Sequence, residues 1–321
     1  MTRQLLVPLD GSALADSAIP LAVEIARRLD LGIMLTRVHS PIGILPSPPE
    51  MPTFIPSPEI DNRIREISEE WLKTKAAEVR HLGGLRVSSE FRAGDPANEI
   101  VALAAEQDAH AIVCSTHGVG GLAPHWIGSV ADFVVRHASC PVLTLPPKAV
   151  VRSGAVAKVL VLLDGSEVSD AILPHAEWLA QAFNAEIELL SVVAPTWLAD
   201  NLSPKDEDRF GVDAYAATVK ERLDGIAAGL RKKGLRVRTV VEIGLSPTRT
   251  ILDHIAHTNP DALALATYGR GFSRLFLGSV ADKVLRSSGR PTLMLRPRVE
   301  AGIRPEVSSA HANAYEFAGG M

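Results

Sequence analysis

The chain has little cysteine, few aromatic residues and no excess of positive charge. Its two cysteines, Cys114 and Cys140, form no CxxC pair, which favours a reduced, cytoplasmic setting over a disulfide-stabilised secreted one. Aromatic residues make up 5% of the 321 residues, so the cores are expected to be aliphatic. The formal net charge of −4 argues against a nucleic-acid partner, which would favour a basic face.

Long hydrophobic runs are also missing. None approaches the ~18–20 apolar residues of a membrane-spanning helix. From Met1 the chain enters a strand-like stretch almost at once, which leaves no room for a signal peptide. We therefore expect a cytoplasmic protein with no membrane partner.

What the sequence does contain is a long internal repeat. The block LVPLDGS at 6–12 returns as LVLLDGS at 160–166, and IGSVAD at 127–132 returns as LGSVAD at 277–282. The copies lie about 150 residues apart, the size of a domain rather than of a solenoid unit. We expect a first domain over residues 1–147, a linker over 148–157, a second domain over 158–297 and a flexible tail over 298–321.

Each half alternates short aliphatic runs with longer helical patterns, typical of an α/β fold with a parallel sheet covered by helices on both faces. Strands are expected at 5–9, 33–39, 86–92, 111–115 and 142–145, and again at 159–163, 186–193, 236–243, 263–267 and 292–295. Helices are expected at 14–29, 59–82, 96–106 and 130–137, and again at 168–183, 206–233, 247–257 and 280–287. The proline-rich segment 40–58 is either a lid or a plain linker.

One end of each sheet carries candidate ligand-binding residues. In open α/β sheets, ligands bind beyond the carboxyl ends of the strands. In the first half, Asp10 follows the first strand, Val38 ends the second, and the glycine-rich segment 115–121 follows the fourth and leads to Gly128 and Ser129 at a helix start. Glycines admit a phosphate close to the backbone, and free N–H groups at a helix start favour an anion. This pattern predicts a polyphosphate on the loop and an adenine or ribose beside Asp10.

A structural interpretation of the same residues stays open. Ser129 and Ser279 make good helix N-caps with an acid three residues later, and Asp10 and Asp164 could cap the helices that follow them. The glycines could form an ordinary loop. No GKS or GKT occurs, so the loop is not a Walker A motif.

The motifs together resemble the universal stress protein family in tandem two-domain form. The first half reads Ser115-x2-Gly118-x9-Gly128-Ser129, followed by Cys140-Pro-Val, close to the family pattern G-x2-G-x9-G-(S/T). The resemblance covers about residues 3–147 and 157–297. It implies two Rossmann-like domains of the adenine nucleotide α-hydrolase type, each a five-stranded sheet of order 3-2-1-4-5. It also implies that the fifth strands of the two domains pair, as in a family homodimer.

The resemblance further implies which residues bind the nucleotide. Adenine is expected near Asp10 and Val38, and the phosphates on the glycine loop and helix start. The full set comprises Pro8, Asp10, Val38, Ser115, His117, Gly118, Gly121, Gly128, Ser129 and Val130 in the first half, and Asp164, Val192, Gly269, Gly278, Ser279 and Val280 in the second.

Two departures from the family pattern bear on affinity. The first signature glycine is Ser115 in one half and Ala266 in the other. If this position has a positive φ, a side chain there raises the free energy of the bound conformation by ~1–2 kcal/mol. If the position is an extended strand end, the side chain adds no such strain. The loop between Gly269 and Gly278 is one residue shorter than the pattern. We therefore expect the first site to be the better one.

Other chemistries are weaker hypotheses. His254 and His257 share a helical face, but two ligands without a partner cluster favour solvated surface histidines over a metal site. His117 beside Ser129 lacks the orienting group and oxyanion site of a hydrolase. We expect no catalytic residues and at most slow ATP hydrolysis.

The sequence thus predicts a stress-response sensor or regulator that binds ATP, with or without magnesium, and not a fast enzyme. Its partners would be the nucleotide itself, the paired second domain and, if it oligomerises, further copies of the chain. The alternative is a nucleotide-free tandem scaffold, which the two departures favour.

Overall fold

The computed structural model describes residues 3–40, 58–118, 127–147, 156–195, 211–267 and 278–297. The chain divides into two compact units, Met1–Gly154 and Ala155–Met321. The linker, the tail, most of the proline-rich segment 40–58, Gly121 and Gly269 lie outside the described residues, so the predictions made for them stay predictions.

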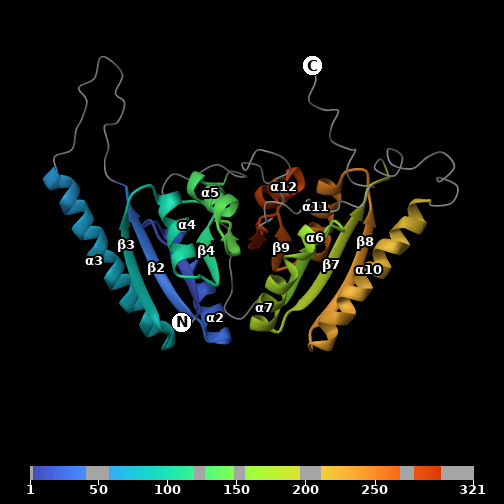
Figure 1. Ribbon diagram of the computed structural model, residues 1–321, viewed down its shortest axis with the longest axis horizontal. Helices are drawn as coiled ribbons and strands as arrows, with labels where there is room; N and C mark the ends of the chain where they lie inside the picture. Colours follow the sequence, from blue (N-terminus) through green and yellow to red (C-terminus); the bar gives the residue numbers. More distant parts are fainter. Residues whose placement is uncertain are drawn as a thin grey trace, which may run out of the picture. The chain divides into compact units, whose positions relative to one another are not determined.

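The first unit alternates strands and helices (Figure 1). Its elements are β1 (Gln4–Pro8), α1 (Ala13–Asp16), α2 (Ile19–Leu29), β2 (Gly32–His39), α3 (Pro58–Gly83), β3 (Val87–Ala93), α4 (Pro96–Glu106), β4 (Ala111–Ser115), α5 (Ser129–His137) and β5 (Val142–Leu145). All its strand pairs are parallel, in the order β3-β2-β1-β4-β5. Helices α2 and α3 pack together, as do α4 and α5, so helices cover both faces of the sheet.

The second unit repeats this plan. Its elements are β6 (Lys158–Leu162), α6 (Glu167–Asp170), α7 (Leu173–Phe183), β7 (Glu186–Val193), α10 (Val212–Lys232), β8 (Arg236–Ile243), α11 (Pro247–Thr258), β9 (Ala262–Ala266), α12 (Ser279–Ser287) and β10 (Thr292–Leu295). Its parallel strands follow the order β8-β7-β6-β9-β10. The predicted strand order is therefore confirmed in both units.

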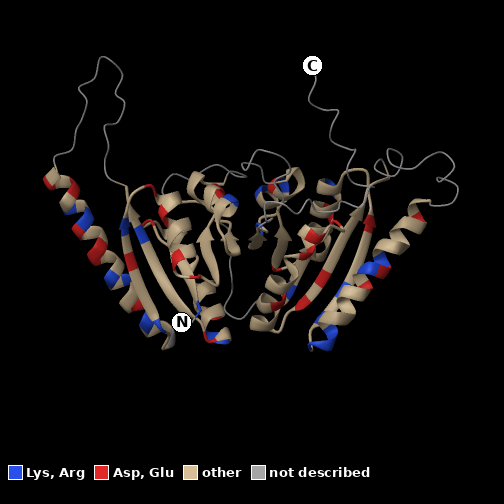
Figure 2. Cartoon of the chain, viewed as in Figure 1, with Lys and Arg blue, Asp and Glu red and all other residues tan. Residues whose placement is uncertain are grey.

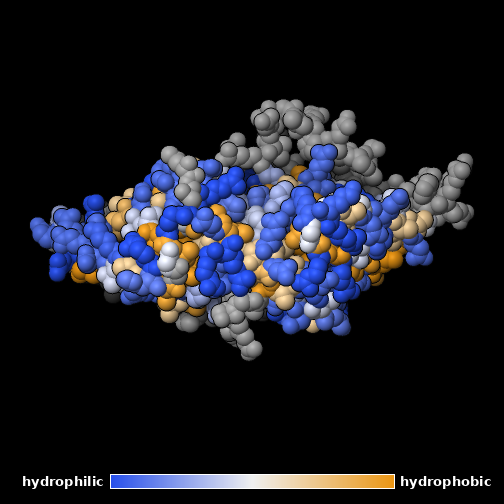
Figure 3. Space-filling view, turned by 90° about the horizontal axis from the view of Figure 1, so that it is seen from below, coloured by the Kyte–Doolittle hydropathy of each residue, from blue (hydrophilic) through white to orange (hydrophobic). Residues whose placement is uncertain are grey.

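The cores are aliphatic, as expected. The middle of β1 and most of β4 are buried, and the largest fully buried side chains are leucines and isoleucines. Figure 3, seen from below in the frame of Figure 1, shows apolar residues scattered among hydrophilic ones on that face. Among the described residues, no helix is both long and apolar enough to cross a bilayer.

Two predicted helices are each broken in two. The helix expected at 14–29 is α1 followed by α2, and the helix expected at 168–183 is α6 followed by α7. Pro20 and Pro174 sit in the first turns of α2 and α7. Proline lacks the N–H that a continuous helix would use, so the chain begins a new helix at each.

Candidate functional site

The candidate site is a hollow of about 440 Å³ in the first unit, beyond the carboxyl ends of β1, β2 and β4. It brings together residues from six elements, β1, α1, β2, α4, β4 and α5, and the loops between them. The sequence-predicted residues that line it are Pro8, Asp10, Val38, Ser115, His117, Gly118, Gly128, Ser129 and Val130. Segments more than a hundred residues apart in the chain thus meet in one place.

Asp10 forms one side of the hollow without capping a helix. Its Oδ1 accepts a hydrogen bond from the Ser12 backbone N–H at 2.9 Å. The cap of α1 is Ser12, whose hydroxyl oxygen accepts from the Ala15 N–H at 3.1 Å. The alternative in which Asp10 caps the following helix is therefore wrong, because Ser12 holds that position and Asp10 fixes the turn before it.

Gly118 lies directly against Asp10. A Cβ placed on Gly118 would stand 2.2 Å from Asp10 Oδ2, well inside any permitted contact. Gly118 is needed for this close approach and not for a positive φ. The Gly118 backbone and the Asp10 side chain therefore form one continuous wall.

The helix α5 opens into the hollow with no side chain capping its start. Its N-cap is Gly128, whose own N–H donates to the Thr116 carbonyl at 2.7 Å. Ser129 is the first helical residue, so the expectation that it is the N-cap is wrong. Asp132, the acid of the expected capping box, is instead bound by Arg136 at 2.7 Å. Within the described part of the chain, no side-chain cap hydrogen bond closes the start of α5, which lines the hollow.

The departure at Ser115 carries no backbone strain. Ser115 and Ala266 are the last residues of β4 and β9, and neither belongs to the non-glycine residues with positive φ in the described chain. Ser115 Oγ donates to the His117 carbonyl at 2.5 Å. The position is therefore an extended strand end, and a side chain there carries no free-energy cost from a positive φ.

His117 is held in place rather than poised as a base. Its side chain is buried, and Nδ1 lies 2.8 Å from Thr116 Oγ1. It is the only imidazole and Asp10 the only carboxylate among the residues that the structure places around the hollow. This arrangement suits binding better than proton transfer.

Eight further residues line the hollow that were not among the predicted site residues, namely Leu9, Ala15, Thr36, Pro96, Ile100, Cys114, Ala131 and Val134. Thr36 is fully buried, and its hydroxyl donates to the Glu90 carbonyl at 2.9 Å. Burial raises the pKa of the Cys114 thiol to about 12, so it stays protonated at neutral pH. Thr36, a polar residue within an apolar strand, was the one signal in the sequence that could have indicated that these strand residues form the floor of the hollow.

The second unit repeats the rim of the site, by which we mean the turn after the first strand and the helix start after the fourth. Asp164 Oδ1 accepts from the Ser166 N–H at 3.0 Å, as Asp10 does from Ser12. Helix α12 begins at Ser279 after the N-cap Gly278, again with no side-chain cap. Ser279 as an N-cap is therefore wrong for the same reason as Ser129, and Ser166, not Asp164, caps α6.

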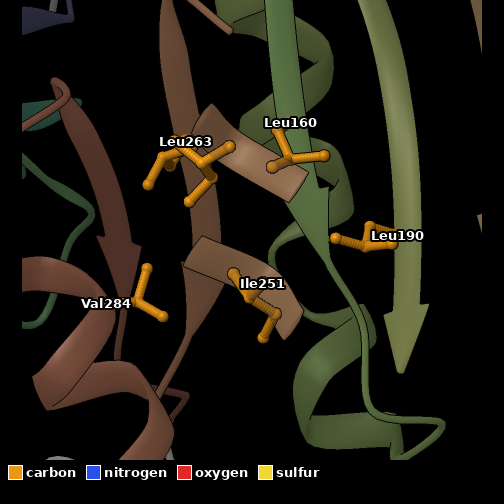
Figure 4. Close-up of a cluster of buried hydrophobic side chains, with 6 residues drawn as sticks. Leu160, Leu190, Ile251, Leu263 and Val284 are labelled. Atoms are coloured by element: carbon orange, nitrogen blue, oxygen red, sulfur yellow. The ribbon is translucent and has the colours of Figure 1, made fainter. Parts of the chain in front are cut away.

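The interior of the second unit differs, because apolar side chains cluster where the first unit has its hollow. In the repeat, Leu190 takes the place of Thr36, Leu265 that of Cys114, and Leu162 that of Pro8. Figure 4 shows the resulting cluster. Its buried members are Leu160, Leu190, Ile251, Ile255, Leu263 and Val284, with Leu162, Val192 and Val280 packed against them.

The histidine pair on α11 has a structural role. His254 is buried, with Nε2 at 2.7 Å from Glu188 Oε1 and Nδ1 at 3.1 Å from Glu242 Oε1. It is therefore not the solvated surface histidine that was expected, whereas His257 is exposed. No group of three potential metal ligands occurs within the described ranges.

Comparison with known proteins agrees with this architecture. The profile of the universal stress protein family matches residues 1–146 and again 156–296. The chain is 27% identical over 305 residues to a universal stress protein of Mycolicibacterium smegmatis, which covers 92% of this chain and 97% of that one. A universal stress protein of Mycobacterium tuberculosis is 30% identical over 300 residues, covering 90% and 96%. The crystal structure of a universal stress protein from Archaeoglobus fulgidus shares the fold, with a TM-score of 0.67 at 19% identity over 92% of this chain and 99% of that one.

Proposed function

The chain belongs to the universal stress protein family, and we propose that its first unit binds ATP or a related adenine nucleotide and so acts as a sensor or regulator in the stress response. The observation that carries this proposal is that Asp10 and the uncapped start of α5 line one hollow. A nucleotide has a polar nucleoside at one end and an anion at the other, which matches these two features.

The phosphates are assigned to the α5 end of the hollow. One helix start contributes ~0.3–1 kcal/mol at an exposed site and up to ~2 kcal/mol in a partly buried one. That is too little to hold a polyphosphate alone, so the backbone around Gly118 and Gly128 must supply further donors. The nucleoside is assigned to Asp10 and Val38, with the carboxylate accepting hydrogen bonds from the ribose or the adenine amino group.

The second unit is assigned a structural role. Its rim residues Asp164, Ser279 and Val280 repeat the first site, but Leu190 and Val192 belong to the apolar cluster around Ile251 and Val284. A nucleotide would have to displace that packing. The alternative of a nucleotide-free scaffold therefore fits this unit, and we propose that the whole chain carries a single nucleotide site.

Catalysis is not part of the proposal beyond slow hydrolysis. His117 Nδ1 is engaged with Thr116, and Asp10 Oδ1 with the Ser12 amide. Whether magnesium accompanies the nucleotide, and whether the fifth strands of the two units pair, remain predictions from the family resemblance.

Thermal unfolding with and without ATP tests the proposal. A ligand that binds the folded state alone stabilises it by about 2.7 kcal/mol at a hundred times its dissociation constant. We expect ATP to raise the melting temperature of the wild type and of Asp164→Ala, but not of Asp10→Ala. The two aspartates form the same turn in the two units, so each variant controls for the other. Equal shifts in all three proteins, or no shift at millimolar ATP, would overturn the proposal.

A further inference from the structure

Helix α3 presents an apolar face that its own unit does not use. Its inner face packs on the unit through Leu72, Ala76 and Val79, which are all buried. In contrast, none of residues 58–67 is buried, although Ile60, Ile64 and Ile67 lie there with 47%, 37% and 57% of their surface exposed. Figure 1 shows α3 beside β3 on the outside of the first unit.

The exposed isoleucines form a regular row with Trp71, which we call the outer stripe. The positions 60, 64, 67 and 71 alternate steps of four and three, which is the spacing of a coiled-coil seam. The described residues around the open space beside the stripe, namely Arg63, Glu66, Ile67, Glu70, Trp71 and Thr74, all come from α3 itself. A row of large apolar side chains on an otherwise charged helix marks an interaction surface rather than solvated surface.

Among the described residues, the first turns of α3 are tied to the rest of the unit by one close side-chain pair, in which Asp61 Oδ1 lies 2.8 Å from His39 Nε2. Short helices without tertiary packing are marginal in water, so a helix of this kind gains from a partner along its apolar row. At the other end of the stripe, the Trp71 ring carries the Arg37 guanidinium at 4.7 Å. The segment before Trp71 is thus the part of α3 that a second helix could pack against.

The charges beside the stripe are complementary to those of a second α3 in antiparallel orientation. Arg63 and Glu70 lie seven residues apart on the same flank of the stripe, and acidic and basic residues alternate along α3 in Figure 2. Antiparallel packing reverses the residue order of the second helix, so Arg63 of one copy would face Glu70 of the other, and Glu70 would face Arg63. Arg63 forms an exposed intrahelical pair with Glu66 at 3.1 Å, which is readily exchanged.

We propose that the outer stripe is a self-association surface, on which α3 of a second copy of this chain packs antiparallel. The apolar row is self-complementary, because in this orientation Ile60 meets Trp71 and Ile64 meets Ile67. Overlap of the two amino-terminal halves keeps the rest of each chain at opposite ends of the helix pair. The proposal rests on α3 alone and is independent of nucleotide binding.

Sedimentation equilibrium of the full chain tests the apolar contact. We expect a concentration-dependent dimer in the wild type, weakened by at least about tenfold in Ile64→Lys/Ile67→Lys. These side chains are exposed in the single chain, so the variant should stay folded. The control Leu245→Lys changes an apolar residue that is 76% exposed in the second unit and should leave the dimer intact.

Charge reversal tests the partner and its orientation. Arg63→Glu and Glu70→Arg should each weaken the dimer roughly fivefold or more. An equal mixture of the two variants should restore it, because each copy then meets the opposite charge. A monomeric wild type, a dimer that survives Ile64→Lys/Ile67→Lys, or a mixture that fails to reassociate would overturn the proposal. If another segment of the chain or a foreign protein covers the stripe, the wild type sediments as a monomer, which has the same consequence.

Discussion

At the scale of single residues, the wall between Asp10 and Gly118 is the most sensitive feature of the candidate site. The loop can run along the carboxylate only because residue 118 lacks a Cβ. Any side chain there pushes either the loop or Asp10 away from its present place. Function and packing therefore depend on the same contact.

Gly118→Ala should weaken ATP binding by tenfold or more, because the methyl group displaces Asp10. The same strain should lower the free energy of unfolding by about 1–3 kcal/mol. Titration calorimetry and urea unfolding measure the two effects. Gly225→Ala is the control, since a Cβ at Gly225 on α10 meets nothing within 4 Å. Unchanged affinity in Gly118→Ala would show that the loop and Asp10 do not act together.

The Glu188–His254 pair gives a second prediction at this scale. In the first unit the corresponding residues are Met34 and Leu103, both buried, so the same place in the fold accepts an apolar pair. His254→Leu should destabilise the protein by about 3 kcal/mol, since it leaves the buried Glu188 without its close partner. That figure is at the low end for such a loss because Lys158 and Arg238 lie about 4 Å from the carboxylate.

The double variant Glu188→Met/His254→Leu should recover most of this stability in urea unfolding. It reproduces the apolar pair of the first unit and removes the buried Glu188 carboxylate together with its close partner. A double variant no more stable than His254→Leu would show that the pair does more than satisfy its own charges.

At the scale of elements, the sequence predicted the strands better than the helix starts. The predicted ranges 111–115, 142–145, 186–193, 236–243 and 292–295 coincide with strands of the structure. Aliphatic runs bounded by glycine, proline or polar residues leave little freedom in where a strand lies. Helix starts depend on which residue becomes the N-cap. At α5 this is Gly128, one residue earlier than predicted, so Asp132 is not at the capping-box position and pairs with Arg136.

The assignment of the phosphates to the uncapped start of α5 can be tested by placing a carboxylate there. Ser129→Asp adds a carboxylate to the first turn, which should stabilise the helix by about 0.3–1 kcal/mol. The same charge should repel phosphates, so the affinity for ATP should fall more than that for adenosine. Ser279→Asp makes the same change in α12 and should stabilise the protein without affecting either ligand. An equal loss of ATP and adenosine binding in Ser129→Asp would contradict the phosphate assignment.

At the scale of the whole molecule, the repeat conceals a difference between the two units. Both keep the rim, with an Asx turn after the first strand and an uncapped helix after the fourth. They differ in the floor, where Thr36, Cys114 and Pro8 become leucines in the second unit. Loop spacing alone ranks the first site higher. The sequence does not reveal these substitutions as part of the site, because it does not tell which strand residues face the hollow.

The central claim is that the hollow of the first unit is the nucleotide site of this chain. Its most direct measurement is a calorimetric titration of the full chain with ATP, which gives the number of sites. We predict one ATP per chain, lost in Asp10→Ala and retained in Asp164→Ala. Two equivalent sites, or the absence of binding at millimolar ATP, would contradict the account.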